Sequence, residues 1–142
     1  MILLDTDHLS VLSHTGSPRA AALPVRLARS LDQPFGFTIV SVVEQFRGWS
    51  AEIHKARDLD RVVWAYGRLS DFVEFVRRMA TFRFDNRAAE AYEALRRQKV
   101  RIGTMDLKIA AIALANGALL LSANLREFGK VPGLRVEDWL RP

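Results

Sequence analysis

Three carboxylates stand where this sequence could form a metal site. Asp5 and Glu44 each follow a run of apolar residues, and Asp106 opens a stretch rich in alanine and isoleucine. Such positions are typical of strand-to-helix junctions, which gather at the carboxyl edge of a parallel sheet, where ligands bind. Carboxylates brought together repel one another unless cations neutralise them, and Mg²⁺ and Mn²⁺ prefer oxygen ligands. The pattern therefore predicts a divalent-metal site formed by these three residues.

Each acid also has an ordinary structural explanation. Asp5 could cap the helix that follows it. Ser41 and Glu44 match the capping box S-x-x-E, with Ser41 as the N-cap. Asp106 could simply complement the positive end of a helix dipole. Taken singly, each acid is better explained in this way, but only the metal-site hypothesis predicts that all three converge beside the first strand.

Other polar side chains could complete the same site. Ser122 and Asn124 follow the fourth expected strand, which neighbours the first strand in the usual orders of such sheets. Both are competent helix caps and both carry oxygen donors. Thr6 and Asp7 are close enough to Asp5 in the chain to support it.

Composition limits the chemistry. The chain has no cysteine, so disulfides and thiolate metal sites are excluded. The three histidines, His8, His14 and His54, show no spacing typical of a metal site, and His8 is interpreted as incidental although it lies near Asp5. The net charge of +5 suits a polyanionic partner such as nucleic acid, with an acidic protein as the alternative.

Length and hydropathy suggest a simple organisation. With 142 residues and no internal linker or repeat, residues 1–142 are expected to form one domain. No apolar run has the length of a membrane span, and the first residues do not have the pattern of a signal peptide. We therefore expect a cytoplasmic protein without membrane contact.

Short strands alternate with helices along the chain. The expected strands are residues 1–5, 37–41, 81–84, 119–122 and 134–136. The expected helices are a turn through residues 9–12, a helix from Ser17 and Pro18 through Leu31, and helices at 42–55, 58–79, 87–98 and 106–116. Pro34, Phe35 and Gly36 are interpreted as punctuation before the second strand. This alternation predicts an α/β fold with a parallel sheet and helices on both faces.

Five segments of the chain resemble motifs of the PIN-domain ribonucleases, and in particular of the VapC toxins, which belong to that family. Residues 1–7, 41–48 and 102–111 resemble the three acidic motifs of the PIN domain. Residues 122–128 and 131–139 closely resemble the C-terminal end of VapC toxins. The resemblance extends over essentially the whole chain.

This resemblance implies a three-layer α/β/α sandwich with a five-stranded parallel sheet. It implies a Mg²⁺-dependent endoribonuclease, with Mn²⁺ as a substitute, that is the toxin of a type II toxin–antitoxin pair. Such a toxin hydrolyses RNA to arrest translation and growth. Members of the family commonly form homodimers and are silenced by a VapB antitoxin.

Carried over by motif, Asp5, Glu44 and Asp106 are the acidic triad. Asp5 and Asp106 would be the principal metal ligands, while Glu44 would bind through water or position the nucleophile. The fourth acid of many PIN domains aligns with Asn124, which is not acidic. Two alternatives stay open at this corner: Glu127 supplies the missing charge, or the protein uses a single well-held ion. Thr6, Ser122 and Asn124 would orient the ligands or the scissile phosphate.

Two other functions remain open. Residues 5–9 superficially resemble the D-x-D start of phosphatases with an aspartate nucleophile, but no paired acidic motif follows the fourth strand. A PIN fold that binds RNA or protein without catalysis is the second alternative, because the fourth acid is missing.

Overall fold

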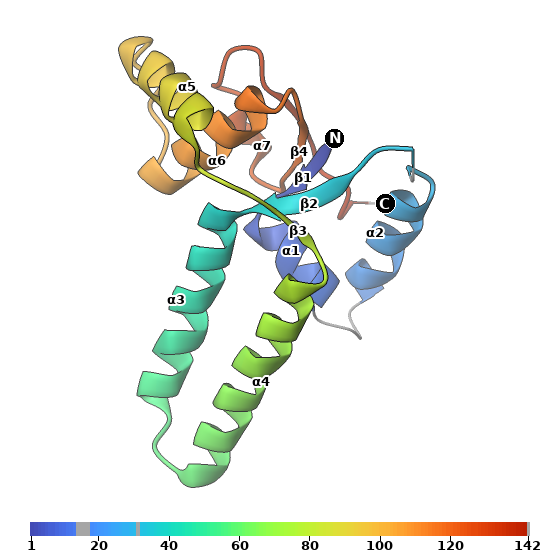
Figure 1. Ribbon diagram of the computed structural model, residues 1–142. Helices are drawn as coiled ribbons and strands as arrows, with labels where there is room; N and C mark the ends of the chain where they lie inside the picture. The colour runs from blue at the N-terminus through green and yellow to red at the C-terminus, as the bar shows by residue number, and fades with distance from the viewer. Residues whose placement is uncertain (14–17, 31, 142) are drawn as a thin grey trace.

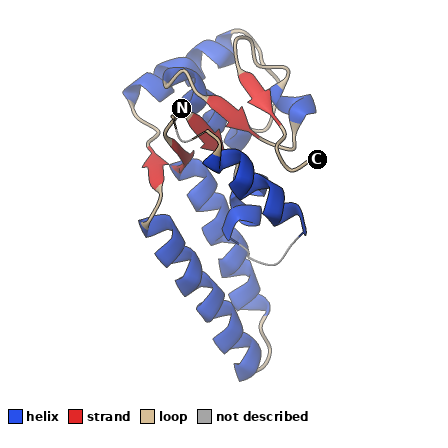
Figure 2. Ribbon diagram, turned by 90° about the vertical axis from the view of Figure 1, so that its right-hand side faces the viewer, coloured by secondary structure: helices blue, strands red, loops and turns tan. Residues whose placement is uncertain are grey.

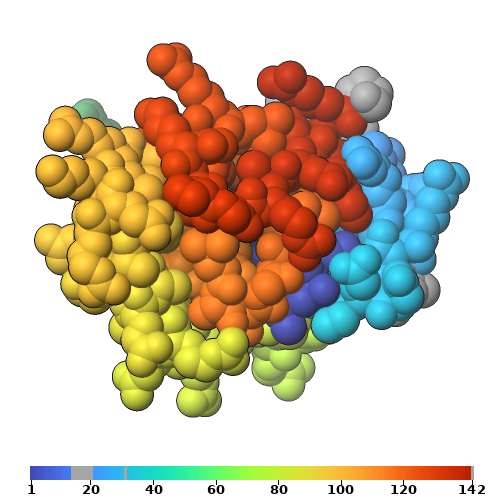
Figure 3. Space-filling model, turned by 90° about the horizontal axis from the view of Figure 1, so that it is seen from above, coloured from blue at the N-terminus to red at the C-terminus, as the bar shows by residue number. Residues whose placement is uncertain are grey.

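A parallel five-stranded sheet forms the centre of the computed structural model, which describes residues 1–13, 18–30 and 32–141. The strand order is β3-β2-β1-β4-β5. The strands are β1 (Ile2–Leu4), β2 (Phe35–Thr38), β3 (Ala80–Phe82), β4 (Leu119–Leu121) and β5 (Arg135–Glu137). Seen from above, the blue start of the chain lies between orange and cyan segments, as expected for β1 between β4 and β2 (Figure 3). The predicted parallel sheet is confirmed.

Helices cover both faces of this sheet (Figures 1 and 2). The helices are α1 (Thr6–Ser13), α2 (Pro18–Ala28), α3 (Ile39–Lys55), α4 (Leu59–Arg77), α5 (Asn86–Arg97), α6 (Thr104–Ala115) and α7 (Leu125–Phe128). Most elements begin and end within two residues of the prediction. Helix α7 was not predicted, because a single turn is too short to show a helical repeat. Helix α2 ends at Ala28, before the predicted end, and Ser17, His14 and Leu31 lie outside the described residues.

The alternating side chains of the central strands divide the core into two layers. Leu3 and Leu120 point toward the apolar faces of α5 and α6. Ile2, Leu4 and Leu121 point the other way, into a cluster with residues of α2 and with Trp139. Period-two alternation on a sheet buried on both sides explains why these strands are apolar throughout. The three-layer α/β/α arrangement is therefore confirmed.

The bounds predicted for the second strand are wrong. The strand was placed at residues 37–41, but β2 ends at Thr38 and the run of Ile39 and Val40 begins α3. Thr38 caps that helix, with its hydroxyl oxygen accepting from the Ser41 amide at 3.1 Å. Gly36, interpreted as punctuation, lies inside β2. Glycine fits at this position because a Cβ there would overlap the carbonyl oxygen of Ala80 on β3.

Helices α3 and α4 form an antiparallel hairpin that projects away from the sheet (Figure 1). Their contact includes an edge-to-face pair between Trp49 and Trp64, with ring centroids 5.9 Å apart. Several large apolar side chains of the hairpin are nevertheless exposed: Phe46, Leu59, Val63, Tyr66 and Val73. In the described part of the chain, no helix is both long enough and apolar enough to cross a membrane.

Candidate functional site

Asp5 lies at the carboxyl end of β1 and is almost completely buried, with 6% of its surface exposed. Its backbone amide extends the sheet by donating to Leu121, at 2.8 Å. One carboxylate oxygen accepts from the Thr6 amide at 2.7 Å, which is a local contact at the start of α1. The other oxygen accepts from the Ser122 hydroxyl at 2.8 Å, across the junction between β1 and β4. Asp5 therefore does more than cap its own helix.

Glu44 lies in the second turn of α3, so the predicted capping box is wrong. Thr38 is the N-cap of this helix, and Ser41 occupies the position that a capping-box acid would take. The Glu44 carboxylate instead accepts a short hydrogen bond from the Thr6 hydroxyl, next to Asp5. The contact brings the acid from the second motif to the first.

Asp106 is the third residue of α6 and lies close to the segment that follows β4. The N-cap of α6 is Gly103, which makes no side-chain capping bond. The Asn124 amide nitrogen lies 3.5 Å from a carboxylate oxygen of Asp106. Glu127 is near enough to raise the pKa of Asp106, but its carboxylate is paired with Lys130 at 3.0 Å. Of the two candidates for the fourth position of the site, Asn124 and Glu127, Asn124 makes the direct contact with Asp106.

The acids affect one another electrostatically. Burial, followed by the charge of Asp7, raises the pKa of Asp5 from 3.8 to about 6, and the charge of Asp106 adds to this shift. Burial also raises the pKa of Asp106, and the charges of Glu44 and Glu127 act in the same direction. Carboxylates with raised pKa values are poorly solvated in their charged form and are stabilised by any cation that reaches them.

Asp7 and His8 also belong to this network, and sequence reasoning missed the role of His8. One oxygen of Asp7 accepts from the Ala123 amide at 2.9 Å, and the other lies 2.7 Å from His8 Nδ1. His8 is fully buried, and its Nε2 accepts from the Trp139 amide at 3.0 Å. No local sequence signal could have indicated a partner so distant in the chain.

The donor set suits a hard divalent cation in its chemistry. Within residues 1–13, 18–30 and 32–141, no three acidic or histidine side chains form a ready-made metal cage. Mg²⁺ does not require one, because it usually binds through one or two carboxylates and keeps several waters. In the same part of the chain, no lysine or arginine forms an ion pair with Asp5, Glu44 or Asp106. A cation would therefore supply charge that these side chains lack.

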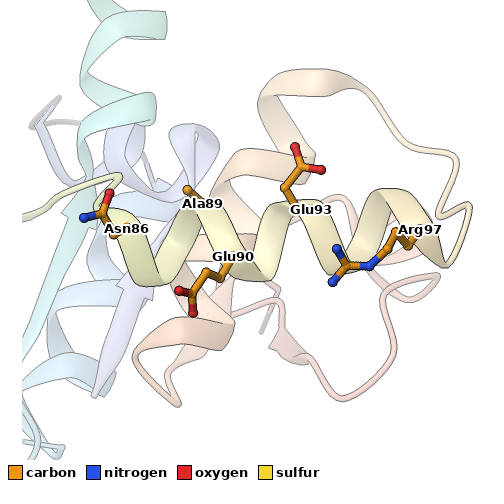
Figure 4. Close-up of a pocket in the computed structure, with 5 residues that line it drawn as sticks. All are labelled: Asn86, Ala89, Glu90, Glu93 and Arg97. Carbon is orange, nitrogen blue, oxygen red and sulfur yellow. The ribbon is translucent and has the colours of Figure 1, made fainter.

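Two hollows lie along α3, and one of them is lined by Glu44. One, of about 310 Å³, is lined by Thr6, Glu44, Gln45, Gly48, Trp49 and Glu52. A second, of about 180 Å³, lies between α3 and α6 and includes Arg47 and Lys108. A larger hollow runs along α5, lined by Asn86, Ala89, Glu90, Glu93 and Arg97 (Figure 4). The larger hollow contains none of the acids described above, so size alone does not identify the site.

The known proteins with similar sequences align with only part of this chain. No family model matches it. The tRNA(fMet)-specific endonuclease VapC of Salmonella typhimurium is 35% identical over 69 residues, which are 46% of this chain and 52% of that protein. Ribonuclease VapC2 of Haemophilus influenzae is 48% identical over 46 residues, 32% of this chain and 35% of that protein. The aligned stretches thus span about half of these relatives or less.

Solved structures match nearly the whole chain. VapBC2 from Rickettsia felis, bound to a promoter DNA fragment, superposes with a TM-score of 0.74 at 23% identity, covering 98% of this chain and 99% of that one. DNA-bound VapBC from Salmonella typhimurium gives 0.71 at 23% identity, covering 97% of both chains. The chain is therefore similar to VapC proteins over part of its sequence, and it shares its fold with the solved VapBC structures over almost its full length.

Proposed function

We propose that this protein is a metal-dependent endoribonuclease and the toxin of a type II toxin–antitoxin pair, which cuts RNA and so arrests translation and growth. The observation that carries the proposal is the convergence of Asp5, Glu44 and Asp106 at one edge of the sheet. Thr6 contacts both Asp5 and Glu44, and Ser122 holds Asp5. Asn124 contacts Asp106, and Asp5 and Asp106 have raised pKa values. A structural role for each acid alone would not require them to meet.

In this proposal Asp5 and Asp106 hold a Mg²⁺ or Mn²⁺ ion, and Glu44 positions the attacking water. The ion supplies positive charge for the phosphate and lowers the pKa of water. Ser122 keeps Asp5 in place from the β4 side, and Thr6 does the same for Glu44 from α1. Asn124, as a neutral donor beside Asp106, orients that carboxylate and offsets part of the rise in its pKa. Basic residues on the rim, such as Arg47 and Lys108, attract the RNA backbone.

The similarity to VapBC structures and the exposed apolar side chains suggest which partners this protein binds. The matched structures are complexes named VapBC, so a small VapB-like antitoxin is the proposed inhibitor. The exposed apolar side chains of the α3–α4 hairpin exceed what this small core needs, which favours a protein interface there. A homodimer and a bound antitoxin are both proposed. Because the Salmonella relative is named for tRNA(fMet), initiator tRNA is the first substrate to test.

The test is cleavage of labelled tRNA and of a mixed RNA pool by purified protein, in Mg²⁺ and in EDTA. The proposal expects discrete cuts in Mg²⁺ and none in EDTA. RNA that is bound in EDTA but never cut in Mg²⁺ or Mn²⁺ would identify a non-catalytic binding module. The absence of a ready-made metal cage in the described residues keeps that second function worth testing. Light scattering at micromolar concentration tests the dimer.

A further inference from the structure

His8 connects two segments that are far apart in the chain. It lies on α1 with no exposed surface. Its Nδ1 is 2.7 Å from an oxygen of Asp7, and its Nε2 is 3.0 Å from the amide nitrogen of Trp139. A carboxylate oxygen of Asp138 lies 3.6 Å from the same Nε2. Both ring nitrogens are therefore engaged inside the protein.

These contacts assign the proton on the ring. The Trp139 amide can only donate, so Nε2 must carry a lone pair. The proton of a neutral imidazole is then on Nδ1, from which it is donated to Asp7. His8 thus acts as donor toward one segment and acceptor toward the other, and no other common side chain does both at these two positions.

Asp7 passes this contact on to the acids. Its second oxygen accepts from the Ala123 amide at 2.9 Å. On one side of Ala123, the Ser122 hydroxyl donates to Asp5 and accepts from the Asn124 amide at 3.0 Å. On the other side, Asn124 reaches Asp106. Hydrogen bonds therefore connect Trp139 through His8 and Asp7 to the backbone of residues 122–124, and side chains of that segment hydrogen-bond to two of the three acids.

The segment of residues 138–141 is itself firmly held. Trp139 is buried in the apolar cluster on the α2 side of the sheet. The Arg26 guanidinium lies 4.6 Å from the centre of its ring, and its indole nitrogen donates to Glu137 at 2.7 Å. Arg141 pairs with Asp138 at 3.1 Å. A rigid segment can serve as a fixed support for the side chain that hydrogen-bonds to it.

We propose that His8 is a positioning residue for the nuclease site: through Asp7 it fixes residues 122–124 against Asp5 and Asp106, with segment 138–141 as its support. This role rests on the proposed function. Removing a partner one step beyond the metal ligands, as Ser122 is to Asp5, commonly changes metal affinity or activity by about 10- to 100-fold, and this range is the upper limit for His8, which acts through that segment. His8 links α1 to residues 138–141 through its Nε2.

Two substitutions separate the two contacts of His8. The amide nitrogen of an asparagine can occupy the place of Nδ1, so His8→Asn keeps a donor for Asp7 and loses the acceptor for Trp139. A glutamine places its amide oxygen near Nε2, so His8→Gln keeps the acceptor and loses the donor. Asparagine is also the smaller residue and leaves the larger cavity, so it should lower stability more. His54→Gln is the control, because it makes the same substitution at an exposed position in the last turn of α3.

Two measurements decide the proposal: hydrogen exchange of the Ala123 amide by NMR, and the kcat and KM of RNA cleavage. We expect the Ala123 amide to exchange about tenfold faster or more in His8→Gln, and kcat to fall by about tenfold, within the range for partners of metal ligands, with little change in KM. His8→Asn should keep more of the protection and more of the kcat, despite its lower stability. A merely structural role predicts the reverse order, with activity following stability.

Ala123 exchange in His8→Gln at the wild-type rate would overturn the proposal, as would a kcat order that follows stability. If the wild-type protein cuts no RNA, the proposed nuclease function is lost, yet the exchange of Ala123 in the two variants still decides whether His8 holds that segment. The failure of one proposal is thereby distinguishable from the failure of the other.

Discussion

Replacing Asp5 with asparagine should stabilise the metal-free protein at neutral pH. The carboxyl group of Asp5 is 6% exposed, and burial together with the charge of Asp7 raises its pKa to about 6. At pH 7 the folded protein therefore holds an ionised group in a position that favours the neutral form. Asparagine has nearly the same shape and removes that charge.

The size of the effect follows from the pKa. The difference between 3.8 and about 6 corresponds to about 3 kcal/mol at pH 7, because one pKa unit is worth about 1.4 kcal/mol. Asparagine keeps one oxygen for either the Thr6 amide or the Ser122 hydroxyl, and losing the other hydrogen bond costs about 1 kcal/mol. The net gain should be about 2 kcal/mol.

The pH dependence has a definite sign. Because the pKa of Asp5 is higher in the folded state, the folded protein binds more protons than the unfolded chain between pH 3.8 and about 6. The stability of the wild-type protein should fall as pH rises through this window, while Asp5→Asn lacks that contribution. The difference between the two proteins should be small at pH 4 and complete at pH 7.5.

Urea unfolding in EDTA at pH 4 and pH 7.5 measures the free energy of unfolding of the wild-type protein and of Asp5→Asn. Asp71→Asn, at an exposed position of α4, is the matched control and should change stability by less than about 0.5 kcal/mol. Added Mg²⁺ should stabilise the wild-type protein and leave Asp5→Asn almost unchanged. If Asp5→Asn is no more stable than wild type at pH 7.5, or if the difference is equal at both pH values, the argument from burial fails.

Three further predictions, made with five substitutions, test separate parts of the structure. Glu44→Gln should leave stability within about 1 kcal/mol, because the residue does not cap α3, yet lower RNA cleavage at least 100-fold; cleavage at the wild-type rate would contradict its assignment. Asn124→Asp should lower the Mn²⁺ concentration for half-maximal cleavage, whereas Glu127→Gln should not; a folded but inactive Glu127→Gln would place the fourth corner at Glu127 instead. Gly36→Ala should destabilise the protein by about 1–3 kcal/mol in urea, because its Cβ meets the backbone of β3. The control Gly67→Ala, which meets no atom, should stabilise it by about 0.5–1 kcal/mol, and similar effects at both glycines would refute the close approach.

Patterns along the chain were enough to predict the architecture. Apolar strands that alternate with helices require a parallel sheet covered on both faces, and this is what the structure shows. The errors arose where local propensity and tertiary contact disagree. Ile39 and Val40 have the β-branched side chains of a strand, but Thr38 caps a helix at that point and the helix places Val40 in the core. Gly36 lies inside a strand, where the backbone of Ala80 on β3 is too close to leave room for a side chain.

The sequence predicted that Asp5, Glu44 and Asp106 lie near one another, but it did not predict the hydrogen bonds that connect them. These three acids could be proposed because each lies just after a strand or in the first two turns of a helix. The contact of Thr6 with Glu44, and that of His8 with Trp139, join residues far apart in the chain. Such contacts depend on how α1 lies against α3 and segment 138–141, which no local spacing reports. The choice between Asn124 and Glu127 likewise depends on a contact with Asp106 that only the folded chain provides.

Divalent-dependent RNA cleavage by Asp106→Asn, compared with wild type at equal concentration, tests the central claim most directly. The asparagine keeps an oxygen for the Asn124 amide and removes a carboxylate whose pKa is raised by burial and by neighbouring charges, so the fold should be retained. We predict a folded protein, at least as stable as wild type in EDTA, whose cleavage in Mg²⁺ or Mn²⁺ falls at least about 100-fold. Cleavage by Asp106→Asn at the wild-type rate would contradict the assignment of this acidic cluster as the metal-binding nuclease site.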